Sequence, residues 1–198
     1  KAAGGFDVAN SLMFNNDASL SRTPSSAGNS RTFTISTWLK RGNLGDYHPF
    51  VFVKASNDNN DLHFTSDDQL KFLDYRGSYN FQLITTRKFR DTSAWYHVVL
   101  AVDTTQGTAS NRIKIYINGV QETSFATESY PSENFDTYFN TTVVHYVGAF
   151  ATSSYFDGYI AETVIIDGTQ NAPTDFGEFD EDSGIWKPID VSGLTFGT

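Results

Sequence analysis

Most of the chain consists of short runs in which apolar and polar residues alternate, and polar turn sequences separate these runs. Residues 31–40 (RTFTISTWLK) place Phe33, Ile35 and Trp38 among threonines and serines, and residues 94–103 (AWYHVVLAVD) are similarly rich in β-branched and aromatic residues. A period of two residues is typical of a strand with one buried face, whereas an amphipathic helix needs a period near 3.6. The pattern therefore predicts strands.

Further strands are predicted in residues 50–54, 61–75, 79–86, 111–125, 141–150 and 155–168, and no segment has the pattern of a long amphipathic helix. Asn118-Gly119, between β-branched runs, predicts a type I′ hairpin turn, which requires positive φ at both positions. About a dozen strands at this spacing favour an all-β, antiparallel two-sheet β-sandwich or jelly roll. We expect one domain over residues 1–198, cut from a longer protein.

Composition narrows the classes of partner and of chemistry. The formal net charge of −9 and the pI of about 4.7 argue against nucleic acid, because an acidic domain repels phosphate. The absence of cysteine excludes disulfides and cysteine nucleophiles. No apolar run reaches the roughly 18–20 residues of a membrane helix, so we expect no membrane insertion. Aromatic residues make up 15% of the chain, which suits both strands and sugar stacking.

Three stretches in order, TISTWLK, AWYHVVLAVD with KIYINGVQ, and YFDGYIAETVIIDGT, resemble the laminin-G-like and pentraxin-like jelly rolls of the concanavalin A-like lectin/glucanase superfamily. The resemblance covers about residues 10–170. It implies a core strand with an inward-facing Trp38, a strand followed by a hairpin, and a strand of the F-x-G-x-I-x-E type. The matching positions of the last two are Trp95, His97, Val98, Asn118 and Gly119, and Phe156, Gly158, Ile160 and Glu162.

The stretches SRTPSSAGNSRTFTISTWLKRG and FGEFDEDSGIWKP are similar to lectin-like domains in structural proteins of bacterial and marine viruses. This second resemblance implies a domain at an extracellular or virion surface that faces host glycans. It also implies repeated copies, as in a homo-oligomer assembled through the parent protein.

The C-terminal segment places four carboxylates within five positions, those of Glu178, Asp180, Glu181 and Asp182. In the glucanases of the superfamily, an E-x-D-x-E pattern on one strand puts two catalytic acids on one face. Here the flanks are rich in turn residues, and Asp182 stands in place of the second glutamate. We therefore predict a solvated acidic turn and not an active site.

Other catalytic sets are also missing. The four histidines, His48, His63, His97 and His145, have no metal-ligand spacing, and we expect His97 to be structural. No serine lies in a G-x-S-x-G elbow, and no glycine-rich phosphate loop occurs. We predict that the protein is not an enzyme.

The segment ASNDNND is the first candidate binding loop, with Asn57, Asp58 and Asn60 as expected ligand contacts. The pentraxin resemblance implies calcium ligands at an Asp-Asn step before the next strand, which Asp58 and Asn59 match. Asp61 adds a further oxygen, and oxygen ligands are those that calcium prefers. The alternative is that these residues only satisfy turns.

The segment DYRGSYN is the second candidate loop, with Tyr75, Arg76, Tyr79 and Asn80. The rings would stack on the apolar face of a sugar while the polar groups bind hydroxyls. Because chain direction reverses with each strand, we expect this loop to lie at the same end of the domain as residues 57–61. Core or edge packing of the tyrosines is the alternative.

A third candidate is the segment GDYHP, with Tyr47 and His48, which we expect at the opposite end of the domain near Tyr155. Together the three loops predict a non-catalytic, lectin-like module that binds a glycan or polysaccharide with weak monovalent affinity. The alternatives are a structural or oligomerisation domain without sugar binding, and a glycan hydrolase.

Overall fold

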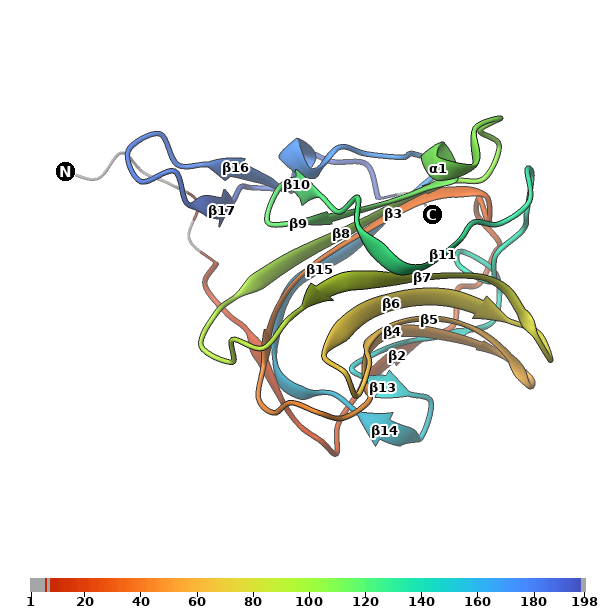
Figure 1. Ribbon diagram of the computed structural model, residues 1–198, viewed down its shortest axis with the longest axis horizontal. Helices are drawn as coiled ribbons and strands as arrows, with labels where there is room; N and C mark the ends of the chain where they lie inside the picture. The colour runs from red at the N-terminus through yellow and green to blue at the C-terminus, as the bar shows by residue number, and fades with distance from the viewer. Residues whose placement is uncertain (1–5, 7, 197–198) are drawn as a thin grey trace.

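The computed structural model describes residue 6 and residues 8–196. Its strands form two main antiparallel sheets packed face to face, which confirms the predicted sandwich (Figure 1). The six-stranded sheet contains, in spatial order, β1 (Leu12–Asn15), β15 (Asp157–Asp167), β3 (Thr32–Arg41), β8 (Tyr96–Asp103), β9 (Ile113–Ile117) and β10 (Val120–Gln121).

The seven-stranded sheet contains, in spatial order, β11 (Phe125–Ser129), β7 (Tyr79–Lys88), β6 (Gln69–Tyr75), β5 (Asp58–Phe64), β4 (His48–Ala55), β12 (Val144–Val147) and β2 (Leu20–Arg22). Two small hairpins are added, β13 (Ala149–Phe150) with β14 (Ser153–Tyr155), and β16 (Gly177–Phe179) with β17 (Trp186–Pro188). Helical structure in the described residues is confined to single turns, α1 (Ala109–Arg112) and η1 (Pro173–Asp175).

Turn chemistry explains how neighbouring strands connect. Asn118 and Gly119 have φ values of 49° and 79°, so the predicted hairpin turn between β9 and β10 is confirmed. Asp68, with φ of 63°, ends the turn between β5 and β6. The polar connection at residues 104–112 contains α1, which the strand pattern did not predict.

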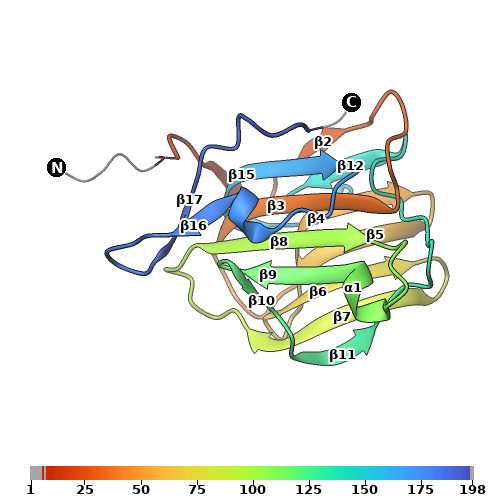
Figure 2. The same cartoon turned by 90° about the horizontal axis from the view of Figure 1, so that it is seen from above.

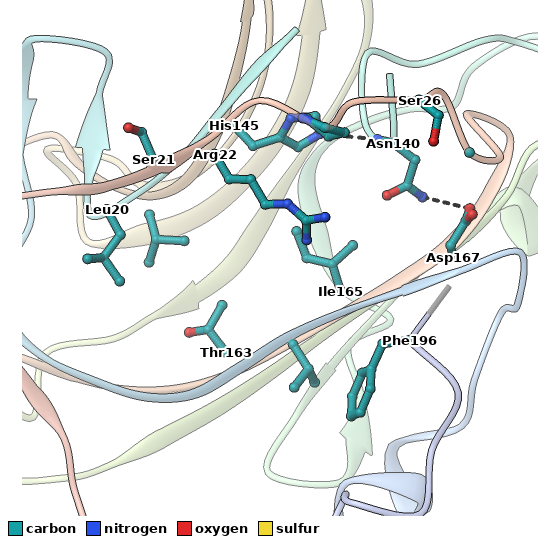
Figure 3. Close-up of a pocket in the computed structure, with 14 residues that line it drawn as sticks. Leu20, Ser21, Arg22, Ser26, Asn140, His145, Thr163, Ile165, Asp167 and Phe196 are labelled. Atoms are coloured by element: carbon teal, nitrogen blue, oxygen red, sulfur yellow. Dashed lines mark hydrogen bonds between the residues drawn. The ribbon is translucent and has the colours of Figure 1, made fainter. Parts of the chain in front are cut away.

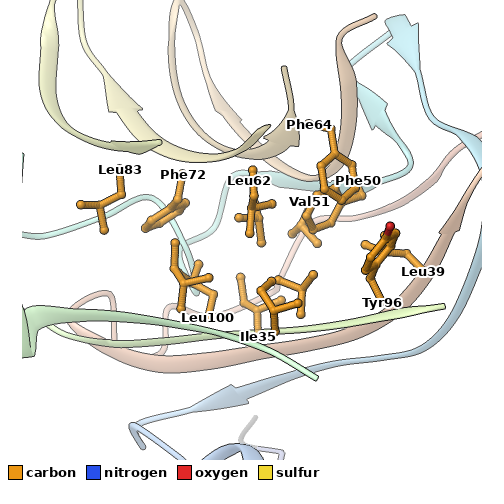
Figure 4. Close-up of a cluster of buried hydrophobic side chains, with 14 of the residues drawn as sticks. Ile35, Leu39, Phe50, Val51, Leu62, Phe64, Phe72, Leu83, Tyr96 and Leu100 are labelled. Atoms are coloured by element: carbon orange, nitrogen blue, oxygen red, sulfur yellow. The ribbon is translucent and has the colours of Figure 1, made fainter. Parts of the chain in front are cut away.

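The main hydrophobic core lies between the two sheets. Leu62, Phe72 and Leu83 of the seven-stranded sheet face Ile35 and Leu100 of the six-stranded sheet, and all five are fully buried (Figure 4). Burial of a side chain of this size stabilises the fold by about 1.5–3 kcal/mol. This contact fixes which face of each strand turns inward, and so determines which polar residues face outward.

The outer face of the six-stranded sheet carries a second layer, formed by the C-terminal segment with β16 and β17 (Figures 1 and 2). Trp186 packs there against Trp38 and Ala161. Trp38 is therefore buried on the outer face of β3 and not between the sheets, which corrects the inward orientation that the resemblance implied. The reason is alternation, because Phe33, Ile35 and Leu39 of β3 occupy the inner face.

The acidic C-terminal segment is a turn, as predicted. Strand β16 ends at Phe179, so Asp182 does not share a strand with Glu178. Asp180 accepts hydrogen bonds from the backbone N–H and hydroxyl of Ser183, both at 2.9 Å, and Lys187 Nζ lies 3.0 Å from its Oδ2. These hydrogen bonds and the Lys187 charge hold the pKa of Asp180 well below its usual range.

Candidate functional site

The outer face of the seven-stranded sheet carries a groove of about 570 Å³, which we call the outer-face groove. Strands β5, β6 and β7 form its floor, and the segment before β4 and the β13–β14 hairpin form one wall. Figure 1 shows this hairpin on the side of the sheet that faces away from the six-stranded sheet. The lining residues are Tyr47, Asn57, Asn59, Asp61, His63, Lys71, Leu73, Tyr75, Tyr79, Phe150, Ser153 and Ser154.

Alternation along β5 selects these residues. Leu62 and Phe64 are in the core, so Asn59, Asp61 and His63 point to the opposite face, toward the groove. The loop between β4 and β5 is shorter than the predicted segment ASNDNND, because strand β5 already begins at Asp58. Most of the candidate loop is therefore sheet, and only half of its polar side chains reach the groove.

A buried polar cluster forms one end of the groove. Asp61 is 2% exposed, and its Oδ2 accepts a hydrogen bond from the Tyr47 hydroxyl. His63 Nδ1 lies 3.0 Å from the same Oδ2, outside hydrogen-bond geometry. Burial, and then the charge of Asp61, raise the pKa of Tyr47, so the phenol stays protonated and donates. Asp61 Oδ1 is itself buried and has no hydrogen-bond partner among the described residues.

Two tyrosines form the other end of the groove. The rings of Tyr75 and Tyr79 pack edge to face with centroids 5.3 Å apart, and Tyr79 is 51% exposed. Lys71 Nζ lies 4.5 Å from the centre of the Tyr79 ring. Near them, the side chains of Asn57 and Asn59 make no hydrogen bond within the part of the chain that the structure describes. At this end of the groove, exposed tyrosine rings therefore lie near asparagine amides that make no hydrogen bond.

His48 and Asn60 were predicted ligand contacts, and the structure corrects both. His48 is 2% exposed, and its Nδ1 lies 3.2 Å from Nη2 of the buried Arg41. Asn60 is fully buried, donates to Asp74 Oδ2 at 2.8 Å and accepts from the Tyr138 N–H at 2.6 Å. The polar atoms of both side chains contact other residues of the protein, because His48 and Asn60 lie on the inner face of their strands.

Arg76 and Asn80, also predicted ligand contacts, do not line the outer-face groove and instead pair with Asp74. Arg76 Nε lies 3.1 Å from Oδ1 of the buried Asp74, and its guanidinium lies over the rings of Phe135 and Tyr138 at 4.8 and 4.3 Å. Asn80 Nδ2 donates to Asp74 Oδ1 at 2.7 Å. Arg76 also donates to the Asp136 carbonyl at 2.6 Å, so its side chain holds the long loop between β11 and β12 against the sheet.

The predicted calcium set is not brought together. Asp58 accepts a hydrogen bond of 2.9 Å from the Tyr138 hydroxyl, whereas Asp61 and Asn59 line the groove. Asp58 and Asp61 are three positions apart on one strand, so their side chains point to opposite faces of the sheet. Within residue 6 and residues 8–196, no group of three or more histidine, aspartate or glutamate side chains could hold a metal.

The relative positions of the loops follow the predicted strand reversal. Asn57 and Tyr75 lie at one end of the sheet, where Asn59 pairs with Tyr75, and Tyr47 begins at the other end. Tyr47 nevertheless reaches the same groove, because it lies across the outer face onto Asp61 and His63. His63, Lys71 and Phe150 also line the groove, although they were not among the predicted ligand contacts. Alternation with Leu62 and Phe72 was the signal that marked His63 and Lys71.

The number of carboxylates in the groove indicates whether it could hydrolyse a glycosidic bond. Among the described residues that line the groove, Asp61 is the single acid, whereas most glycosidases need two carboxylates that flank the bond they cleave. In the described part of the chain, no helix is long and apolar enough to cross a membrane.

The antiparallel two-sheet sandwich, with a groove on its outer face, places the protein among the jelly rolls of the concanavalin A-like type. The sequence profile of the concanavalin A-like lectin/glucanases superfamily matches residues 14–173, and the chain belongs to this family.

Solved structures with the same fold have different settings. Domain 4 of an extracellular arabinanase from Geobacillus stearothermophilus, in complex with arabinotriose, aligns with a TM-score of 0.64 at 20% identity, over 85% of this chain and 75% of that one. A heptameric SAP-like pentraxin from Limulus polyphemus aligns at 0.58 and 14% identity, over 84% and 80%. Domains LG4-5 of the mouse laminin alpha1 chain align at 0.58 and 13% identity, over 98% and 48%. Identities this low support a shared fold.

A comparison with proteins of curated function finds no match.

Proposed function

We propose that this protein is a non-catalytic, lectin-like module that binds a glycan in the outer-face groove. The convergence of Tyr75 and Tyr79 with the amides of Asn57 and Asn59, which make no hydrogen bond in the described chain, supports this proposal. A tyrosine face stacks on the C–H face of a sugar, while an amide and a carboxylate bind its hydroxyls. These are the two kinds of contact that a sugar needs.

The state of Asp61 favours hydrogen bonding over catalysis. Its Oδ2 is occupied by the Tyr47 hydroxyl, and its Oδ1 has no partner in the described residues. A buried acceptor without a partner costs about 1–3 kcal/mol, and a side-chain shift on glycan binding that lets a sugar hydroxyl donate to it recovers part of this energy. A lone acid without a second carboxylate fits recognition better than glycoside hydrolysis.

We place the module outside the cell or on a virion surface, as a part of a larger assembly. One structural neighbour is a domain of an extracellular arabinanase bound to arabinotriose, which supports a glycan partner and an extracellular setting. Each hydrogen bond to a sugar gives only about 0.5–1.5 kcal/mol, so one groove binds weakly. Repeated copies then supply avidity.

The proposal is tested by a glycan array followed by calorimetry with the strongest oligosaccharide, with arabinotriose included in the panel. Tyr79→Ala is expected to weaken binding about three- to tenfold, because an aromatic contact contributes about 0.5–1.5 kcal/mol. Asn59→Ala is expected to weaken it by a similar factor. Tyr79 is half exposed, so its replacement leaves the fold intact.

Tyr159→Ala is the matched control, because Tyr159 is 39% exposed and lies on β15 in the other sheet. It is expected to leave glycan affinity unchanged. Equal loss in both tyrosine variants, or full affinity in Tyr79→Ala and Asn59→Ala, would move the site away from the groove. Release of sugar by the purified protein, abolished by Asp61→Asn, would replace the binding function with hydrolysis.

A structural or oligomerisation role is the second candidate, and exposed apolar side chains favour it. Met13 on β1 is 55% exposed and pairs with the exposed Tyr159 on β15, which gives one sheet edge an apolar surface. Two results together would favour this role: no binding to any glycan of the array, and a stable oligomer in size-exclusion chromatography that Met13→Lys dissociates.

A further inference from the structure

A second cavity lies on the open side of the sandwich, between β2 at the edge of the seven-stranded sheet and β15 of the six-stranded sheet (Figure 3). Its volume is about 490 Å³, within the range of about 300–1,000 Å³ that small-molecule sites occupy. We call it the side cavity. It shares no lining residue with the outer-face groove, so its function is independent of the glycan proposal.

The side cavity exists because two strands leave neighbouring edges uncovered. Strand β1 pairs with β15 only over Asp157–Ile160, and the register of β15 shifts between Ala161 and Val164. Beyond this bulge, where Glu162 has φ of 47°, no strand of the described chain continues from β1 along β15. Of the strands in the described chain, β2 likewise pairs only with β12. The gap between these edges opens toward the apolar interior.

The wall of the side cavity is largely apolar. Leu20 comes from β2, Val147 from β12 and Ile165 from β15, and Phe196 reaches the cavity from the C-terminal segment. Figure 3 shows Phe196 and Ile165 on one side of the opening and Leu20 on another. An apolar ligand body that displaces water from these side chains gains about 25 cal/mol per Å² of buried apolar area.

Among the described residues that line the side cavity, Arg22 is the only lysine or arginine, and its guanidinium points into the cavity (Figure 3). No carboxylate of the described chain lies within 4.0 Å of this guanidinium, and it makes no hydrogen bond there. Arginine binds carboxylates through two parallel N–H donors, so a free Arg22 beside an apolar wall suits an anion.

The other titratable groups that line the cavity, Asp167 and His145, each accept hydrogen bonds within the protein. Asp167 Oδ1 accepts from the backbone N–H of Asn29 at 2.7 Å and from Asn140 Nδ2 at 3.1 Å. His145 accepts the Asn140 N–H at Nε2 and donates from Nδ1 to the Val143 carbonyl, at 3.1 and 2.8 Å. This pattern is that of a neutral imidazole, so Arg22 supplies the positive charge available to a ligand.

We propose that the side cavity binds a small amphipathic organic anion. Its carboxylate pairs with the Arg22 guanidinium, and its apolar body packs against Leu20, Val147, Ile165 and Phe196. The charge comes from one side chain at the rim and the apolar surface from both sheets, so neither a neutral hydrocarbon nor a free inorganic anion matches the whole site.

The test uses 3-phenylpropionate as the anionic probe and 3-phenylpropionamide as its neutral counterpart, titrated into ¹⁵N-labelled protein and followed by NMR. The acid is expected to shift the amide resonances of β2, β12 and the second half of β15. Arg22→Gln is expected to weaken binding of the acid about tenfold, as the loss of a charge-assisted pair does. The amide is expected to bind weakly and equally to wild type and variant.

Lys88→Gln is the matched control, because it removes the same charge from the exposed end of β7, far from β2 in the strand order. It is expected to leave the affinity for the acid unchanged. The proposal is overturned if about 10 mM acid leaves the cavity resonances in place, or if the acid and the amide bind equally well. It is also overturned if Arg22→Gln and Lys88→Gln weaken binding to the same extent.

Discussion

The indole N–H of Trp186 donates a hydrogen bond of 2.9 Å to Nδ1 of His97, across 89 positions of the sequence. The two rings are nearly parallel, with centroids 5.9 Å apart, and Trp38 stacks on His97 with a centroid separation of 4.5 Å. Ser36 Oγ lies 2.8 Å from the remaining ring nitrogen of His97. The imidazole is thus fully satisfied while neutral, and it fastens the C-terminal hairpin to the six-stranded sheet.

Trp186→Phe is expected to lower the free energy of unfolding by about 1–3 kcal/mol. The phenyl group of phenylalanine keeps an aromatic ring at this position, but Nδ1 of the buried His97 would lose its hydrogen-bond donor. Urea denaturation measures the effect. Ile185→Ala is the control on the same hairpin, because Ile185 is 66% exposed, and a change within about 0.5 kcal/mol is expected for it. Equal effects of the two substitutions would contradict a stabilising role of the hydrogen bond.

Stability is expected to fall as the pH drops below about 6.5, the pKa of an unfolded histidine. Burial lowers the pKa of His97 to about 3, and it also lowers those of His48 and His145. The unfolded state therefore binds more protons in this window, and each group costs up to about 1.4 kcal/mol per pH unit. Urea denaturation between about pH 7 and pH 4.5 measures the slope before carboxylates titrate. A flat profile there would contradict burial of neutral histidines.

Asp68→Asn is expected to destabilise the protein by about 3–5 kcal/mol, because it leaves the buried guanidinium of Arg41 without a counter-charge. Arg41 Nη1 lies 3.0 Å from Asp68 Oδ1, and its side chain is fully buried. Asparagine tolerates the positive φ of 63° at this position, so the backbone turn is retained. Thermal and urea denaturation measure the loss.

The neighbouring Asp67→Asn is the control for that substitution. Asp67 is 75% exposed and lies 4.0 Å from Lys88, a distance at which a surface pair contributes little. Its stability is expected to stay within about 0.5 kcal/mol of wild type. If both asparagine variants behave alike, the Arg41 pair does not stabilise the fold.

Gly119→Ala is expected to cost more stability than Gly45→Ala. Both glycines have positive φ, 79° and 76°, which costs an alanine about 1–2 kcal/mol. A Cβ at Gly119 would also lie 2.4 Å from the Trp186 ring, whereas a Cβ at Gly45 meets nothing within 4 Å. Denaturation midpoints of the two variants isolate the contact with Trp186. Equal losses would show that the indole does not rest on this turn.

Calcium is expected to leave the melting temperature unchanged, because Asp58 and Asp61 face opposite sides of β5 and cannot share an ion. Differential scanning fluorimetry with calcium and with a chelator measures this. A rise in melting temperature with calcium that Asp61→Asn abolishes would restore a metal site at the groove.

Strand periods, polar turns and the Asn118-Gly119 pair are local features, which is why the sequence predicts a two-sheet sandwich and its hairpins. The same alternation was available for the site, since Asn59 and Asp61 alternate with Asn60 and Leu62. The turn-rich composition of the segment ASNDNND predicts a loop, and a loop does not distinguish the inward-facing Asn60 from its neighbours. Where a strand begins earlier than expected, every second residue of the presumed loop turns toward the core.

Residues 45–47 and 149–155 are distant in sequence from β6 and β7, and no local pattern predicts that Tyr47 and Phe150 form a wall of the same groove. Nor does any period predict that Trp186 crosses the outer face to reach His97. Such contacts depend on how loops pack over the outer faces of the sheets. Many loop arrangements satisfy the same local backbone and turn preferences. Alternation therefore determines the sheets and their inner faces, while long-range packing alone decides which outward residues meet and form a site.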